Sequence, residues 1–244
     1  NLQYFVGNSA QPTTLGGDRL LTTFKEIDDS NRIIFSFIQQ IEGNSDVSSN
    51  LEIKKQILDF LLENLGANTP TVAHFLLGYE FQGDYLKLSR PGNTLLKTLV
   101  YILSQSLDLI SYVDFSNSNV TVVDGPPAAI SSKILEVLVK LCQSSITSEV
   151  TLKFLRNYEI QDINLFTRLL KLPRIDRFTE WSSVKFSKEL SSEFLRLEGP
   201  KTLIAFVNQR DQLLKYFALE LHNIPSPLVQ RQLYVDALLK NSDF

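Results

Sequence analysis

Apolar residues recur at spacings of three and four through most of this chain, and that periodicity constrains its fold more than any other feature. Side chains three and four positions apart lie on the same face of an α-helix. A first stretch of this kind predicts a helix that begins near Asp18 and is stopped by Gly43. Its inward face would consist of Leu20, Leu21, Phe24, Ile27, Ile34, Phe35, Ile38 and Ile41.

A second helix is predicted after the polar turn at 42–50. Ser49 and Glu52 have the spacing of a capping box, in which each side chain satisfies a free backbone N–H of the other residue. We expect Gly66 to end this helix in the left-handed conformation. The apolar face between these ends is unusually broad, and it consists of Leu51, Ile53, Ile57, Leu58, Phe60, Leu61, Leu62 and Leu65. A face of that width predicts that two or more neighbouring helices cover it.

The segment GANTPTVAHFLLGY at 66–79 compresses a helix start and a helix stop into fourteen letters. We expect Asn68 or Thr69 to cap the helix, with Pro70 at the first helical position, where its missing N–H costs nothing. Gly78 would end it. Because nearly every residue between these signals is apolar, the segment predicts a short buried helix between longer ones.

The same signals predict further helices along the rest of the chain. They begin at RPGN (90–93) and DGPP (124–127), and others follow near 147–156, 162–171, 187–197, 200–222 and 227–239. Only YVDFSNSNVTVV at 112–123 has strand-like residues, and it could form a long loop or a small hairpin.

About nine or ten helices joined by short turns indicate an all-α chain. Since no fixed-period repeat is present, we expect an irregular α-helical solenoid of stacked antiparallel helices, broadly like armadillo or HEAT repeats. Residues 1–17 are expected to form a flexible lead-in, and 18–244 a single solenoid segment. The chain contains no methionine, even at position 1, so we expect it to be a segment of a longer protein.

Composition excludes several classes of protein. The net charge of -3 gives no global field that would attract nucleic acid or anionic lipid. A single cysteine, Cys142, rules out an internal disulfide framework and suits a reducing compartment. The most apolar run, LLKTLVYIL at 95–103, is too short to span a bilayer. Gly16 and Gly17 form the only glycine pair, and the spacing of a phosphate-binding loop is absent.

Few residues of the types that carry catalysis are present. Cys142 ends the apolar helical run ILEVLVKLC, where a cysteine behaves as a small hydrophobic residue. His74 lies on the short helix and is expected to make one satisfying hydrogen bond, and His222 would complement a helix C-terminus. An α-helical enzyme that uses Cys142 or His74 is the alternative interpretation. We predict instead a protein with no catalytic residue, no metal and no cofactor.

Basic residues form the candidate partner-binding site. Arg168, Lys171, Arg174 and Arg177 follow one another at intervals of three, and Arg210 interrupts the apolar face of the 200–222 helix. Such a cluster could bind an acidic peptide or a phosphate. Alternatively, Arg168 and Lys171 complement a helix C-terminus, and Arg174 and Arg177 lie on a solvated turn. In that interpretation the aliphatic part of Arg210 packs on the core and its charge lies in water.

One stretch also carries a family resemblance. The segment NTPTVAHFLLGYE at 68–80, with the preceding LEIKKQILDFLLENLGA, resembles the very large α-helical scaffold nucleoporins of the inner ring of the nuclear pore. In that family a long helix is followed by a Pro-started segment of the form A-x-x-LLG-[YF]-E. The matching residues here are Ala73, Leu76, Leu77, Gly78, Tyr79 and Glu80.

The resemblance implies a non-catalytic, architectural function. It implies a segment of a long solenoid that holds the inner ring together by capturing short motifs of linker nucleoporins. The implied partners are other nucleoporins, including a neighbouring inner-ring scaffold, without direct contact to nucleic acid. The implied location is the nuclear pore complex in the nuclear envelope, where the protein would support nucleocytoplasmic transport. A generic helical-repeat peptide-binding module, such as a nuclear transport receptor or a trafficking adaptor, remains the alternative.

Overall fold

The computed structural model describes residues 30–43, 48–67, 69–82, 85–88, 94–110, 125–157, 159–160, 163–164, 199–223, 231–232 and 235–236. The elements in chain order are α3 (Ser30–Glu42), α4 (Ser48–Asn64), α5 (Val72–Leu77), β1 (Tyr79–Gln82), β2 (Tyr85–Leu88), α6 (Leu95–Ile110), α7 (Gly125–Gln143), α8 (Ser148–Asn157), β3 (Glu159–Ile160), β4 (Ile163–Asn164) and α12 (Gly199–Asn223). Helices account for most of these residues, so the expected all-α class is confirmed.

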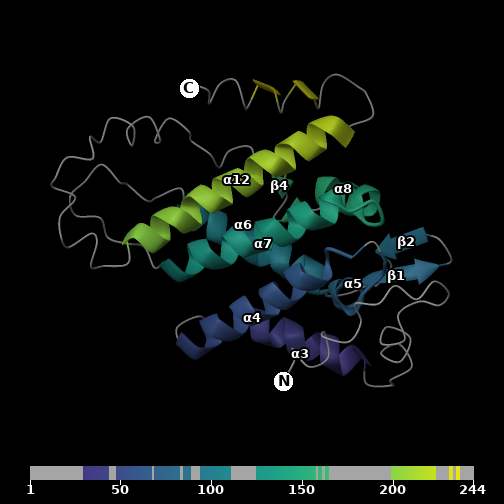
Figure 1. Ribbon diagram of the computed structural model, residues 1–244, viewed down its shortest axis with the longest axis horizontal. Helices are drawn as coiled ribbons and strands as arrows, with labels where there is room; N and C mark the ends of the chain where they lie inside the picture. Colours follow the sequence, from purple (N-terminus) through teal and green to yellow (C-terminus); the bar gives the residue numbers. More distant parts are fainter. Residues whose placement is uncertain are drawn as a thin grey trace.

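Helix α7 lies at the centre of the described core. It packs against α4, α6, α8 and α12, and α3 in turn packs against α4 and α6. Figure 1 shows α12, α7, α4 and α3 following one another from the top of the view to the bottom. Because α7 has neighbours on several sides, it is apolar and buried over most of its circumference. Its buried residues include Ile134, Leu135, Val137, Leu138, Val139, Leu141 and Cys142.

The predicted apolar face of α4 is largely confirmed. Leu58, Leu61, Leu62 and Leu65 are buried, and α4 contacts α3, α5 and α7, as the breadth of its face predicts. Ile53, at the edge of that face, is the exception, since it is 38% exposed. On α3, the prediction that Phe35 faces inward was wrong, since Phe35 is 58% exposed. Helices α6, α7, α8 and α12 also occupy the ranges that the sequence indicated, within a few residues at their ends.

Several predicted helix ends were wrong. Helix α4 already includes Ser48, so Ser49 lies inside the helix and is not its cap. Gly66 follows α4, but its φ lies outside the left-handed region, and the turn there does not require glycine. Helix α5 is capped by Thr71 rather than by Asn68 or Thr69, and it begins at Val72. Pro70 therefore precedes the cap and does not occupy the first helical position.

Gly78 ends α5 in the left-handed conformation, as predicted, with φ of 101°. Its N–H donates to the carbonyl oxygen of Phe75 over 3.0 Å, and the chain then enters β1 directly. Strands β1 and β2 form an antiparallel hairpin in which Tyr79 pairs with Leu88. This hairpin was not predicted, although Gly83-Asp84, between two runs of strand-forming residues, is a typical two-residue hairpin signal.

A second short antiparallel pair corrects another prediction. Glu159 pairs with Asn164, and Ile160 pairs with Ile163. The helix predicted from 162 therefore does not begin there, because 163–164 form the strand β4.

Other predictions concern residues outside the described part of the chain. These are the lead-in at 1–17, the start of the first helix at 18–29, the strand-like run at 112–123, the rest of 162–171 and the helix at 187–197. Of the predicted 227–239 helix, 231–232 and 235–236 are described and are helical. The solenoid arrangement and its domain boundaries stay predictions. Within the described residues, no helix has the length and apolar character needed to cross a membrane.

Candidate functional site

The predicted partner-binding residues are not tested by the described structure. Arg168, Lys171, Arg174 and Arg177 lie outside the described residues. Arg210 lies within α12, but its side chain is not among those described. Their role in binding stays a prediction. The described polar and titratable side chains lie elsewhere, at the contacts between the described helices and strands.

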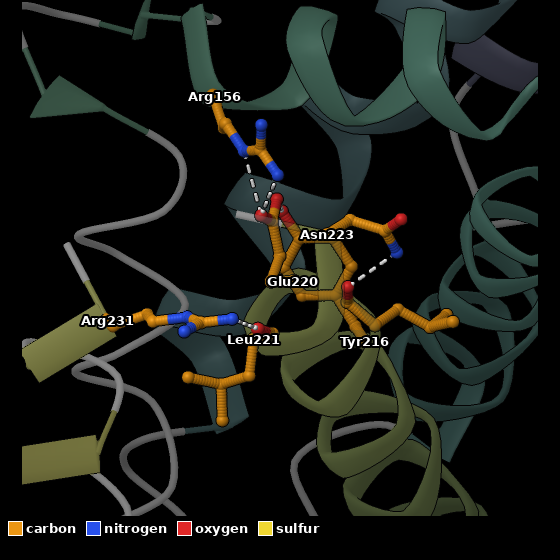
Figure 2. A network of polar contacts seen from close by, with 7 residues as sticks. Arg156, Tyr216, Glu220, Leu221, Asn223 and Arg231 are labelled. Carbon is orange, nitrogen blue, oxygen red and sulfur yellow. Dashed lines mark hydrogen bonds and ion pairs between the residues drawn. The ribbon is translucent and has the colours of Figure 1, made fainter. Parts of the chain in front are cut away.

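The main buried polar cluster consists of Arg156, Tyr216 and Glu220, which we name the Glu220 network. Glu220 is 0% exposed, although its side chain is a carboxylate. Its Oε2 accepts a hydrogen bond from Arg156 Nε at 2.8 Å and lies 2.7 Å from Arg156 Nη2. Its Oε1 accepts a hydrogen bond from the hydroxyl of Tyr216 at 2.8 Å. Figure 2 shows the two nitrogens of Arg156 directed at the carboxylate from α8.

The position of Glu220 on α12 explains its burial. Leu213, Tyr216, Phe217 and Glu220 follow at the spacing i, i+3, i+4 and i+7, which places them on one helix face. All four are buried. Leu214 and Leu221, which neighbour this face, are only partly buried. The sequence signal for the burial of Glu220 was the helical spacing of Leu213, Tyr216 and Phe217, which continues to Glu220 on the same face.

Cys142 lies close enough to this network for its ionisation to respond to it. The thiol is 1% exposed. Burial raises the pKa of Cys142 far above its usual range, the negative charge of Glu220 raises it further, and the positive charge of Arg156 partly offsets these effects. A buried thiol that stays protonated is a poor nucleophile, so the geometry supports the structural role that was predicted for Cys142.

His74 also has the structural role that was predicted. Its Nδ1 accepts a hydrogen bond from the backbone N–H of Thr71 at 3.1 Å, and burial lowers the pKa of His74 to about 4. The acceptor role of Nδ1 assigns the proton of the neutral ring to Nε2. The Thr71 hydroxyl donates to the carbonyl oxygen of Asn64 at 3.2 Å, which joins the start of α5 to the end of α4. His222 lies exposed in the last turn of α12.

A chain of hydroxyl groups joins β1 to α8. Thr151 Oγ1 donates to the carbonyl oxygen of Thr147 at 2.7 Å. Because Thr151 has only one hydroxyl proton, the hydroxyl of Tyr79 donates to Thr151 Oγ1, at a distance of 2.7 Å. Burial raises the pKa of Tyr79, and the hydrogen bond with Thr151 partly opposes this rise. The phenol thus stays protonated and fixes the hairpin against α8.

Two lysines bind the free carbonyl groups at the ends of neighbouring helices. Lys54 Nζ on α4 donates to the carbonyl oxygen of Gly43, just after α3, at 2.5 Å. Lys140 Nζ on α7 donates to the carbonyl oxygen of Leu62 in the last turn of α4, at 2.9 Å. Cations at helix C-termini satisfy carbonyls that have no partner within the helix and complement the helix dipole.

These groups connect the elements of the described core to one another. The Glu220 network, the hydroxyl chain and the lysine contacts each join two different elements. No group of three or more His, Cys, Asp or Glu side chains in the described residues is placed to hold a metal ion. The described polar groups therefore act mainly to fix helices relative to one another.

Comparison with known proteins identifies the family. A family model described as nuclear pore complex scaffold, nucleoporins 186/192/205 (Nup192) matches residues 2–244. No curated protein matches the chain. The family match extends over nearly the whole chain, well beyond the segment that carried the resemblance, and it does not favour a transport receptor or trafficking adaptor. We conclude that the chain belongs to the Nup192 family of nuclear pore complex scaffold nucleoporins.

Proposed function

We propose that this chain helps to hold the inner ring of the nuclear pore together by binding short motifs of linker nucleoporins. The observation that carries the proposal is the match of residues 2–244 to a scaffold family of the nuclear pore complex. That family is structural, it is located in the nuclear envelope, and its members have other pore components as partners. A structural protein of this kind acts through the surfaces that it offers to those partners.

The internal connections of the core support this proposal. The buried polar groups of α4, α7, α8 and α12 are directed at partners within the chain. Helices held in this way can present a fixed surface, and a preorganised surface binds a flexible peptide with less loss of entropy. Helical scaffolds commonly receive short partner segments in the grooves between their stacked helices.

We further propose that the basic residues contribute to motif binding. Arg168, Lys171, Arg174 and Arg177 concentrate four positive charges within ten residues of a chain whose net charge is -3. Arginine pairs with carboxylates through two parallel hydrogen bonds, so this cluster suits an acidic motif. Arg210 is a second candidate contact. Neighbouring inner-ring scaffolds are a further class of partner for the same protein.

A pull-down experiment tests the proposal. Purified linker nucleoporin segments would be incubated with the immobilised chain and with a variant that carries Arg168→Glu, Lys171→Glu and Arg174→Glu. A matched control carries the same change in charge at three exposed described positions, as Lys87→Glu, Lys153→Glu and Lys215→Glu. We expect the wild-type chain and the control to retain at least one linker segment, and the basic-cluster variant to lose it.

The outcomes separate the two parts of the proposal. If the wild-type chain retains no linker segment, the proposed function in motif binding is contradicted. If all three proteins retain the same segment equally, motif binding stands and the basic cluster is excluded as its site. Equal losses in the control and the basic-cluster variant would indicate a general effect of charge, and would also exclude a specific site.

A further inference from the structure

The apolar face of α12 does not by itself fix where the helix lies along α7. Leu213, Tyr216 and Phe217 are buried in the contact between the two helices. A helix that slides by one turn moves about 5.4 Å and brings the residue three or four positions away to nearly the same place. Since apolar contacts are non-directional, apolar burial distinguishes neighbouring positions along the axis less sharply than a hydrogen-bonded ion pair does.

Glu220 is the residue on this face for which such a displacement is costly. Both of its carboxylate oxygens are bound, one by Tyr216 of the same helix and one by Arg156 of α8. A displacement of about 5.4 Å would separate Glu220 from Arg156 by more than a hydrogen bond can span. The carboxylate would then be buried without its cation, which is strongly unfavourable.

The Glu220 network lies at the C-terminal ends of two helices. Arg156 lies in the last turn of α8, and Glu220 lies in the last turn of α12. At the same end of α12, Arg231 Nη2 donates to the carbonyl oxygen of Leu221 at 3.3 Å (Figure 2). The exposed ion pair between Asp211 and Lys215 joins two residues of α12 itself, so it carries no information about the position of that helix.

We propose that the Glu220 network sets the position of α12 along α7 and so selects one arrangement of the C-terminal part of the described core. A buried ion pair replaced by apolar residues of similar size often costs little stability or even adds some. The network therefore contributes selectivity between packing arrangements more than it contributes stability. In stacked helices each helix contacts its neighbours, so a displacement of α12 would be passed to whatever packs on it.

The test measures a distance along α12 in the 244-residue chain. Spin labels would be attached at Lys153→Cys on α8 and Asn208→Cys on α12, both exposed, with Cys142→Ala in every protein to leave only these two thiols. Asn208 lies about 18 Å along the helix axis from Glu220. The line between the two labels therefore runs mainly along α12, and a slide of α12 changes the distance between the labels by nearly the length of the slide. Pulsed electron paramagnetic resonance measures the distribution of the distance between the two labels.

The deciding variant replaces both charges, as Arg156→Met with Glu220→Leu. We expect the parent protein to show one narrow distance. The double variant is expected to unfold cooperatively with an unfolding midpoint at least as high, and to show a broadened distribution or a second distance displaced by about 5 Å. The single variant Tyr216→Phe removes one hydrogen bond and keeps the ion pair, and we expect it to keep the single distance.

Two results would overturn the proposal. One is a folded double variant with the same single narrow distance as the parent. The other is a double variant with a clearly lower unfolding midpoint than the parent, because the pair would then supply stability instead of selecting a position. A control variant with Asp211→Asn and Lys215→Gln removes the exposed pair of the same helix. If this control broadens the distance distribution as much as the double variant does, a specific role for Glu220 is contradicted.

Discussion

His74 shows how the surroundings of one residue replace catalytic chemistry with a structural role. Its ring is fully buried and accepts a hydrogen bond from Thr71 N–H through Nδ1. Protonation of Nδ1 would remove that acceptor and place a buried positive charge against an N–H group. Burial therefore holds the pKa of His74 at about 4, against an ordinary value of 6.5. The neutral ring is an integral part of the start of α5.

This shift predicts a pH dependence of stability. Because the pKa of His74 is lower in the folded chain, the unfolded chain binds more protons below pH 6.5. The free energy of unfolding should therefore fall as the pH drops from 6.5 to 4, by about 3 kcal/mol from this residue alone. The measurement is chemical denaturation across this pH range, compared with His74→Gln, which cannot titrate and keeps an acceptor. Parallel pH profiles for the two proteins would contradict the prediction.

Leu77 tests the packing of the same helix. Its side chain is 0% exposed and belongs to the core cluster that α4, α5, α6 and α7 share. We expect Leu77→Ala to lower the free energy of unfolding by about 2–5 kcal/mol, because transfer energy is lost and a cavity is left. Denaturant titration of the two proteins measures this difference in the free energy of unfolding.

Ile53 provides the control for Leu77. It lies on α4 and is 38% exposed, so Ile53→Ala removes a similar number of carbon atoms from a site that water already reaches. We expect a cost below about 1 kcal/mol. Equal costs at Leu77 and Ile53 would show that α5 does not lie in the core as described.

At the scale of elements, α5, β1 and α6 meet in a close contact at Gly78. Gly78 ends α5 with φ of 101°, a conformation that side chains other than glycine rarely adopt. A Cβ atom at this position would lie 2.8 Å from Cγ2 of Thr94. Thr94 directly precedes α6, and its Oγ1 accepts a hydrogen bond from the backbone N–H of Lys97 at 3.3 Å. The glycine thus allows the end of one helix to touch the cap of another.

Gly78→Ala should therefore destabilise the chain for two reasons. The left-handed conformation costs about 1–2 kcal/mol with a side chain, and the contact with Thr94 adds a cost of overpacking of about 1–3 kcal/mol. Thermal and denaturant unfolding measure the sum. Adding Thr94→Ser removes Cγ2 and keeps the capping oxygen, so we expect the double variant to recover part of the second cost only.

Gly66 is the matched control for Gly78. It has no left-handed φ, and a Cβ atom there would meet nothing within 4 Å. Gly66→Ala should be neutral or should stabilise by up to about 1 kcal/mol, since it reduces the freedom of the unfolded chain. A destabilisation at Gly66 as large as that at Gly78 would refute the role given to the backbone conformation.

The contrast between what the sequence predicted and what it missed follows from the range of the interactions. Helices α4, α7 and α12 were predictable because the spacing of apolar residues that lie close together in the sequence indicates a helix. The cap of α5 was misplaced because His74 takes the position that glutamate or glutamine usually fills in a capping box. The burial of Glu220 was missed because its cation, Arg156, lies 64 residues away.

At the scale of the whole molecule, the family gives the described core its context. The chain belongs to the scaffold of the nuclear pore complex, in the nuclear envelope. Central helix α7 contacts α4, α6, α8 and α12, so most of the described helices are joined through one element. Buried polar contacts then fix neighbours such as α8 and α12 relative to each other. This construction suits a protein whose function is to keep other proteins in place.

The exchange rate of the protein at the nuclear envelope tests this account most directly. The protein would be tagged with a fluorescent protein in living cells, and the nuclear rim would be photobleached. We predict a rim signal that recovers far more slowly than that of a transport receptor bleached in the same cells. Diffuse or vesicular labelling, or a recovery as fast as that of the receptor, would contradict a scaffold function.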